Sequence, residues 1–332
     1  MSEGGVSVAG SEGGTTGGPR SGATPSEPLG AVSGLLAGQV GIVTGGGKGL
    51  GRAFCLHLAA NGAALVVNNR NRQVDADGRG PADHVVAEIG SAGGRAVAEY
   101  SDVADPAAGE RLVRTAVETF GRCDFLVCNA AVSNPEMFHK TTPERFDALL
   151  AINIGGTAHV AMAASRHMRT AGYGRIVLVS STGGLHGEPT ASAYSASKGA
   201  LIGLGRAIAV EGERRGVLTN LLLPYATTQM TDTGMDPRYR EAMTAAAVAP
   251  VVTALVDPAG TLNGQVVVAG GAGVRAAAAV EYGTVRLPQK AFGAAALGEL
   301  LRVSREREPR EFPTALAAFF DLAADVSGGS AG

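Results

Sequence analysis

Tryptophan is absent from this sequence of 332 residues, and aromatic residues make up only 5% of it. Few side chains are therefore available on which the bases of a single-stranded nucleic acid could stack. The formal net charge is -2, so no excess of positive charge attracts nucleic acid or an anionic membrane surface. We expect neither as a partner, and we expect no apolar run long enough to span a bilayer.

Cysteine and histidine are scarce too. The three cysteines, Cys55, Cys123 and Cys128, are odd in number and form no CxxC pair, and the six histidines form no HxH or HExxH pattern. The cysteine pattern is typical of a reduced, cytoplasmic chain that uses cysteine as a small apolar residue. The histidine pattern predicts that there is no metal site.

Glycine, in contrast, is plentiful, with 49 residues. Residues 1–36 combine it with Ser, Thr, Pro and Glu and contain few large apolar side chains, so we expect a disordered tail that is not a secretory signal. A second change of composition follows Pro288. The sequence thus predicts a tail (1–36), one domain (37–288) and a helical extension (289–332), with helices near Ala291–Leu301 and Thr314–Ala324.

Within residues 37–288, short runs of β-branched apolar residues alternate with segments of helical spacing. Near-continuous apolar strands separated by helices are typical of a parallel sheet that is covered on both faces. The sequence therefore predicts a doubly wound, Rossmann-type α/β fold of about seven strands with right-handed crossovers. The expected strands are Val40–Val43, Leu65–Val67, Ala96–Ala98, Phe125–Val127, Ile176–Val179, Leu218–Leu223 and Val266–Val268.

The first expected strand runs directly into a glycine-rich turn that is followed by a helical segment. Such a turn lets the backbone approach a pyrophosphate, and the helix N-terminus supplies free N–H groups and a positive dipole. An ordinary strand–helix turn is the alternative in so glycine-rich a chain, but the position after the first strand favours a dinucleotide site. The candidate residues are Thr44, Gly45, Gly47, Lys48, Gly49, Leu50 and Gly51.

The residues after the second expected strand bear on the choice of cofactor. An acid here would favour NAD by binding the ribose 2′-hydroxyl, but the sequence reads Asn68-Asn69-Arg70. Asn69 and Arg70, with Lys48, suit a 2′-phosphate, so NADP(H) is favoured and NAD(H) stays open. The alternative is that both cations are solvated surface charges. Asp102, followed by Val103, is placed either to accept from the adenine amino group or to cap a helix.

Tyr194 and Lys198 lie four residues apart and so share one helix face. A nearby ammonium would lower the pKa of the tyrosine hydroxyl, ordinarily about 10, towards the range useful for proton transfer. The alternative is a routine exposed pair. Ser181 ends an apolar strand, where its hydroxyl could polarise a substrate carbonyl beside Tyr194. Asn153 lies in an apolar helical stripe and needs a partner, either a water leading to Lys198 or a helix-packing contact.

In order and spacing, these motifs and Cys128-Asn129-Ala130-Ala131 resemble the classical short-chain dehydrogenase/reductase family from about Gln39 to Ala272. The resemblance implies a nicotinamide-dependent oxidoreductase whose catalytic tetrad is Asn153, Ser181, Tyr194 and Lys198. It also implies that the cofactor contacts Tyr194, Lys198, Asn129, Ala130 and Ala131, although the family usually has glycine in place of Ala131.

Three further segments carry a closer likeness: the Asn68–Gly80 loop, Leu223–Thr231 and the tail beyond Val274. They resemble the (3R)-hydroxyacyl-CoA dehydrogenase portion of peroxisomal multifunctional enzyme type 2 and its stand-alone bacterial relatives. The likeness implies cofactor contacts from Pro224 and Thr228 and a 3-oxoacyl or 3-hydroxyacyl thioester substrate, such as an acyl-CoA. Arg70 departs from the subgroup's usual Asn-Asp, and the last three residues do not match a peroxisomal address.

The substrate pocket is expected between Val132–Pro135, Thr182–Glu188 and a mobile lid from Thr231 to Ala249. Four further side chains are candidates for substrate contact, although solvation or packing is the commoner role of each: His186, Met230, Met235 and Met243. A cluster of arginines would either meet coenzyme A phosphates or form a solvated helix face, which the interleaved glutamates favour: Arg302, Arg305, Arg307 and Arg310.

Other functions stay open on sequence grounds. One is a ketoreductase for a polyketide, a steroid or another alicyclic ketone, and another is a catalytically idle cofactor-binding scaffold, against which the intact tetrad speaks. A lyase or epimerase would need an extra acid, for which Glu188 is a candidate. The helices around Pro143–Ala171 and Tyr194–Arg215 are apolar all round, which predicts a homodimer or homotetramer.

Overall fold

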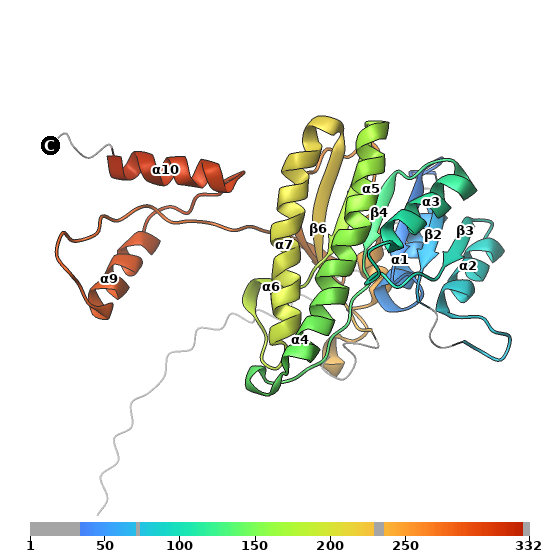
Figure 1. Cartoon of the computed structure of the whole chain (residues 1–332), viewed down its shortest axis with the longest axis horizontal. Coiled ribbons are helices and arrows are strands. Elements are labelled where there is room, and N and C mark those ends of the chain that lie inside the picture. The colour runs from blue at the N-terminus through green and yellow to red at the C-terminus, as the bar shows by residue number, and fades with distance from the viewer. Residues whose placement is uncertain (1–33, 71–73, 229–235, 328–332) are drawn as a thin grey trace, which may run out of the picture.

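The computed structural model describes residues 34–70, 74–228 and 236–327. Its centre is one sheet in the order β3-β2-β1-β4-β5-β6-β7-β8 (Figure 1). β1 to β7 are parallel to one another, and β8 is antiparallel to β7. The doubly wound α/β fold is confirmed, with one strand more than expected. The strands are β1 (Val40–Thr44), β2 (Ala64–Asn68), β3 (Arg95–Glu99), β4 (Phe125–Cys128), β5 (Gly174–Val179), β6 (Val217–Tyr225), β7 (Val266–Gly270) and β8 (Gly273–Ala277).

Helices cover both faces of the sheet, which is why β1, β2, β4 and β5 are buried along their whole length. One apolar layer joins the sheet to α1 (Gly49–Ala60), α2 (Pro81–Ser91) and α8 (Ala245–Leu255). The opposite layer joins it to α3 (Ala108–Phe120), α5 (Thr157–Ala171) and α7 (Ser192–Gly212). The shorter elements are α4 (Pro143–Leu150), α6 (Gly183–His186), η1 (Phe138–Lys140), η2 (Ala151–Gly156), η3 (Glu213–Arg215) and η5 (Pro237–Tyr239).

The expected N-terminal tail lies mostly outside the described residues, which begin at Gly34. Leu36, which the sequence assigns to that tail, is fully buried against the first apolar layer. Its backbone N–H donates to the Asn61 carbonyl at 2.8 Å. The folded body therefore begins a few residues before Gln39.

The longest helical run on the second face joins α4, the π-helical turn η2 and α5. Contrary to the expectation from sequence, this run (Pro143–Ala171) has the length and hydropathy of a membrane span, and it is the one such helix in the described part of the chain. Its apolar residues pack inside the fold: Val160, Ala164 and Met168 lie in the core between α3 and the sheet. Core packing accounts for its composition.

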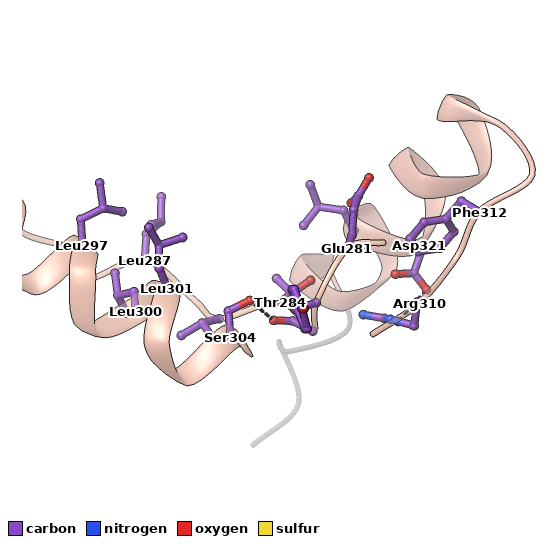
Figure 2. A pocket seen from close by; sticks show the side chains of 14 residues that line it. Glu281, Thr284, Leu287, Leu297, Leu300, Leu301, Ser304, Arg310, Phe312 and Asp321 are labelled. Atoms are coloured by element: carbon purple, nitrogen blue, oxygen red, sulfur yellow. Dashed lines mark hydrogen bonds and ion pairs between the residues drawn. The ribbon is translucent and has the colours of Figure 1, made fainter. Parts of the chain in front are cut away.

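Beyond β8 the chain leaves the sheet and forms α9 (Ala294–Arg305) and α10 (Ala315–Ser327), which stand apart from the α/β body in Figure 1. Both helices were expected from the sequence, within a few residues. The extension and residues 281–287 line a cavity of about 260 Å³. In Figure 2, leucines lie on one side of it and Arg310 and Asp321 on the other. These two residues form an ion pair of 2.7 Å. A hydrogen bond of 3.0 Å from Arg206 Nη2 on α7 to the Phe312 carbonyl ties the extension to the body.

Three of the four arginines of the extension are engaged by residues of the extension or of the segment that leads into it. Arg302 pairs with Glu299 and Glu306, and Arg307 donates to the Thr284 carbonyl. Arg310 pairs with Asp321 and Asp325. These contacts favour the structural interpretation of the cluster over a coenzyme A site.

Candidate active site

A cleft of about 840 Å³ opens at the carboxyl ends of the parallel strands. This is the edge at which doubly wound sheets bind their ligands, because the strand order reverses between β1 and β4. Most of the residues singled out from the sequence line it: Gly45, Lys48, Gly49, Leu50, Asn69, Arg70, Asp102, Val103, Asn129, Ala130, Ala131, Ser181, Tyr194, Lys198, Pro224 and Thr228. Thr44, Gly47, Gly51 and Asn153 are not among its lining residues.

The glycine turn after β1 has no room for side chains. Gly45 has φ +63°, and a Cβ there would lie 2.9 Å from Ala130 Cα. A Cβ on Gly51 would lie 2.1 Å from the Gly45 carbonyl oxygen. The side chain of Lys48, the N-cap residue of α1, makes no capping hydrogen bond. Lys48, Gly49 and Leu50, at the start of α1, line the cleft, and this placement fits a pyrophosphate bound at a helix N-terminus.

Thr44 supports this turn from below. Its buried Oγ1 accepts from the backbone N–H groups of Asn129 and Ala130 at 3.0 and 3.2 Å. The Asn129 amide in turn donates to the carbonyls of Thr44 and Gly45 at 3.2 and 3.1 Å. The ends of β1 and β4 are thus joined by a small polar network. Thr44 does not line the cleft itself but holds in place the residues that do.

The far end of the cleft holds the residues that follow β2 and β3. Asn68 donates from Nδ2 to Glu99 Oε2 and to the Ser101 carbonyl, at 2.8 and 3.0 Å. Arg70 forms an ion pair of 2.8 Å with Asp102. The sequence singled out both charged residues, but separately, so their pairing is a new observation.

Asn153 lies fully buried in the π-helical turn η2. Its side chain accepts from Val132 N–H at 2.9 Å and donates to the Val132 carbonyl at 3.0 Å. Nδ2 also donates to Ser197 Oγ at 3.0 Å, and that hydroxyl donates to the Tyr194 carbonyl at 2.7 Å. Protein groups therefore satisfy the amide, and the water considered from the sequence is not needed as its partner. The role of Ser197 was missed.

Ser181, Tyr194 and Lys198 meet in the wall of the cleft. The Ser181 side chain lies close enough to the Tyr194 hydroxyl to lower its pKa. The Lys198 amine lies 5.6 Å from the centre of the Tyr194 ring and donates to the Val179 carbonyl at 2.8 Å. The structure thus brings together, in one cleft wall, three side chains that the sequence singled out separately.

Comparison with known proteins agrees with this geometry. A family model described as short chain dehydrogenase matches residues 39–243. The chain belongs to this family. It is accordingly an oxidoreductase that works with NAD or NADP on a small-molecule substrate.

Individual relatives bear out the assignment. The short-chain type dehydrogenase/reductase Rv0148 of Mycobacterium tuberculosis is 41% identical over 239 residues, which are 71% of this chain and 84% of that protein. Peroxisomal multifunctional enzyme type 2 of Mus musculus is 39% identical over 229 residues, 68% of this chain but only 31% of the mouse enzyme. A crystal structure of a short chain dehydrogenase from Mycobacterium avium matches with a TM-score of 0.73 at 35% identity, covering 85% of this chain and 99% of that one.

Burial governs the ionisation of the dehydrogenase's tyrosine and lysine. Desolvation raises the pKa of Tyr194, and the hydrogen bond from Ser181 lowers it by less. Desolvation lowers the pKa of Lys198 from 10.5 to about 8. The sequence predicts that Lys198 lowers the pKa of Tyr194, whereas in this structure burial raises it and the lowering contact comes from Ser181. The neutral tyrosine is the form that can donate a proton.

The expected substrate segments also reach the cleft, through Val132, Ser133, Asn134, Thr182, Gly183 and Glu188. His186 is exposed and is not among the lining residues, and Met230 and Met235 lie outside the described residues. Thr190 is the non-glycine residue with positive φ (63°) in the described chain, and its carbonyl accepts from Glu136 N–H at 2.6 Å. This contact joins the two substrate-side loops.

Several lining residues were not predicted: Asn68, Ser101, Ile152, Val179, Ser180, Ala191, Tyr225 and Ala226. Most adjoin predicted site residues at strand ends, and that adjacency was the available signal. Among the described residues, no group of three or more His, Cys, Asp and Glu side chains is arranged to hold a metal ion.

Proposed function

We propose that this dehydrogenase interconverts a 3-oxoacyl thioester and the corresponding 3-hydroxyacyl thioester, with Asn153, Ser181, Tyr194 and Lys198 as its catalytic and positioning residues. The observation that carries the proposal is the meeting of the Ser181 and Tyr194 hydroxyls in the wall of the cleft, beside the buried Lys198 amine. When bound, the nicotinamide supplies a hydride to the carbonyl carbon or takes it up from the alcohol.

Each side chain has a distinct part in the proposed reaction. In the direction of reduction, Tyr194 donates its proton to the substrate oxygen, and Ser181 donates a hydrogen bond to the same atom. The Lys198 ammonium stabilises the phenolate that remains and holds the cofactor ribose. Asn153 contacts neither the substrate nor the cofactor in this scheme. It is a positioning residue that holds Val132 and, through Ser197, the first turn of α7.

The substrate class is supported by relatives and by the subgroup likeness. The 3-oxoacyl-[acyl-carrier-protein] reductase of Synechocystis is 35% identical over 198 residues, 59% of this chain and 78% of that enzyme. The matched part of the mouse multifunctional enzyme agrees with the likeness to a hydroxyacyl-CoA dehydrogenase portion. Beyond the expected cofactor residues, the cleft extends to Val132 and Glu188, where a substrate would bind.

We propose NADP(H) as the favoured cofactor, with NAD(H) also accepted. No acid stands at the end of β2, where Asn68 and Asn69 occur. Lys48 and Arg70 line the cleft from two sides and offer positive charge to a 2′-phosphate.

The test is a titration of purified protein with NADPH and with NADH, followed by acetoacetyl-CoA and a panel of cyclic ketones. Loss of absorbance of the reduced cofactor with the thioester supports the proposal. Turnover of cyclic ketones alone would show that the substrate is instead a polyketide, a steroid or another alicyclic ketone. Binding of cofactor with no turnover of any substrate would favour an idle scaffold.

For the whole chain, we propose a catalytic domain (37–288), a C-terminal extension (289–332) and association of copies as a homodimer or homotetramer. α9 and α10 expose large apolar side chains, among them Leu316, Phe319 and Phe320, each about 60% exposed. Apolar patches of this kind commonly mark protein contacts. A cytoplasmic location stays a prediction.

A further inference from the structure

Arg70 and Asp102 form an ion pair at the end of the cleft that is proposed to hold the adenosine. Arg70 follows β2, Asp102 follows β3, and Nη1 of Arg70 lies 2.8 Å from Oδ2 of Asp102. Both side chains line the cleft and are 34% exposed, so water screens the pair only in part.

The surroundings hold the two residues in this arrangement. Asp102 Oδ1 accepts from Ala104 N–H at 3.1 Å, which fixes the carboxylate to its own loop. Asn69 N–H donates to the Glu99 carbonyl at 3.0 Å, and the Asn68 amide bridges to Glu99 and Ser101. The segments that carry the pair are therefore joined by further hydrogen bonds, and the pair is part of the local fold.

We propose that Asp102 sets the cofactor preference by holding Arg70 in this pair. The proposal rests on the proposed function, in which Arg70 meets the 2′-phosphate of NADP(H). A 2′-phosphate is doubly anionic near neutral pH, so it must draw Arg70 away from Asp102 and approach the carboxylate at the same time. NAD(H) has an uncharged hydroxyl at this position, so its binding neither breaks the ion pair nor brings an anion close to the Asp102 carboxylate. Asp102 thus moves the preference back towards NAD(H), so that one site accepts both cofactors.

The deciding variant is Asp102→Asn. The amide keeps an oxygen that can accept from Ala104 N–H and from the adenine amino group, and it removes the charge that holds Arg70. Isothermal titration calorimetry of the cofactor-free variant should show a preference for NADPH over NADH that is about tenfold larger than in the wild type. Because the two cofactors share the adenine, any loss of adenine binding cancels in the ratio of dissociation constants.

Two further variants show whether the effect passes through Arg70. Arg70→Ala should weaken NADPH binding about tenfold and leave NADH binding nearly unchanged. When Arg70 is already alanine, the further change Asp102→Asn should raise the preference for NADPH over NADH by less than about threefold. Glu88→Gln is the matched control, because it removes the carboxylate of another exposed arginine pair, Arg52–Glu88 at 2.6 Å, which does not line the cleft. Its cofactor ratio should equal that of the wild type.

The possible failures are distinguishable. If Arg70→Ala weakens NADPH binding but Asp102→Asn leaves the ratio unchanged, the role of Asp102 is wrong and the contact of Arg70 with the phosphate stands. If Arg70→Ala leaves NADPH binding unchanged, the assignment of Arg70 is itself wrong. An equal shift in Glu88→Gln would reduce the effect to net charge and overturn the proposal. If Asp102→Asn does not fold, Asp102→Ser, which keeps an oxygen acceptor, takes its place with the same expected shift.

Discussion

Lys198 illustrates at the scale of one residue how the site exchanges stability for chemistry. Its amine is charged at neutral pH, yet the side chain is only 3% exposed. In the described part of the chain the amine contacts the Val179 carbonyl and the Tyr194 ring, neither of which carries a negative charge. Burial of the charge therefore costs folding free energy. In exchange, the site holds a cation close to Tyr194, whose hydroxyl must become a phenolate.

Replacement of Lys198 by Met should stabilise the cofactor-free protein below about pH 8. The folded pKa of Lys198 is about 8 against 10.5 in the unfolded chain, a difference worth about 3 kcal/mol. Below pH 8 Lys198 is protonated in both the folded and the unfolded protein, so the folded protein bears the full cost of the buried charge. Between pH 8 and pH 10.5 only the unfolded protein keeps the proton, so the free energy of unfolding of the wild type rises with pH. The variant also loses the hydrogen bond to the Val179 carbonyl, which offsets about 1 kcal/mol of this stabilisation. Urea unfolding at several pH values measures the difference, which should shrink towards pH 10.5; a variant that is less stable than the wild type at pH 7 would contradict this account.

Thr44→Val should damage the cofactor site although Thr44 does not line it. Valine has nearly the same shape, but it leaves the N–H groups of Asn129 and Ala130 without their buried acceptor, which costs about 1–3 kcal/mol for each group left unpaired. We expect lower stability in thermal unfolding and weaker cofactor binding in calorimetry. Thr44→Ser keeps the hydroxyl and serves as the control; equal losses in both variants would mean that the hydroxyl is not responsible.

The sequence identified site residues better than it identified their partners. The Tyr194–Lys198 pair was predictable because both lie on one helix, whose period fixes their spacing. The Arg70–Asp102 pair joins segments 32 positions apart, and only the packing of β2 beside β3 brings them together. Asn153 was likewise identified as a buried polar group, but its bonds to Val132 and Ser197 depend on tertiary packing that periodicity does not contain.

At the scale of elements, seven parallel strands were predictable because each is a short apolar run followed or preceded by a helical segment. β8 was missed because Gly273–Ala277 contains one β-branched residue and is largely exposed. Three glycines at this turn, Gly270, Gly271 and Gly273, were the available signal, since glycine allows a tight hairpin. The π-helical turn η2 was also missed, because six residues are too few to separate its period from that of an α-helix.

The turn η2 should depend on the Asn153 side chain. Asn153→Ala removes the bonds to Val132 and Ser197, so the loop that lines the cleft from Val132 to Asn134 loses its anchor. We expect kcat to fall by at least about tenfold and the free energy of unfolding by about 1–3 kcal/mol. Ser197→Ala breaks only one of these bonds and should cost less in both measurements. A larger loss from Ser197→Ala than from Asn153→Ala would contradict the central place of the asparagine.

At the scale of the whole molecule, the C-terminal extension is the part that a single copy of the chain does not explain. Its helices were predictable from composition, but their distance from the body was not, because it depends on contacts between segments rather than on local propensity. In the described chain the extension lines a small cavity together with residues 281–287, and it exposes Phe319 and Phe320. Exposed aromatic surface of this kind costs solubility unless a partner covers it.

Ending the chain after Pro288 should therefore lower the oligomeric state. Sedimentation velocity at several protein concentrations compares the shortened and full-length chains, and a smaller assembly or a weaker association constant is expected. Arg302→Gln, which changes an exposed residue of α9 paired with Glu299, is the control and should assemble as the wild type does. An unchanged assembly of the shortened chain would place the contacts elsewhere, on α5 or α7.

The central claim is that Tyr194 transfers the proton, and Tyr194→Phe tests it most directly. The variant keeps the ring beside Lys198 and removes only the hydroxyl that meets Ser181. The measurement pairs steady-state oxidation of NADPH by a 3-oxoacyl thioester with calorimetric titration of the cofactor. The account predicts that kcat falls by roughly 10²–10⁴-fold while the dissociation constant of the cofactor changes less than about threefold. A variant that retains kcat within about twofold of the wild type would contradict it.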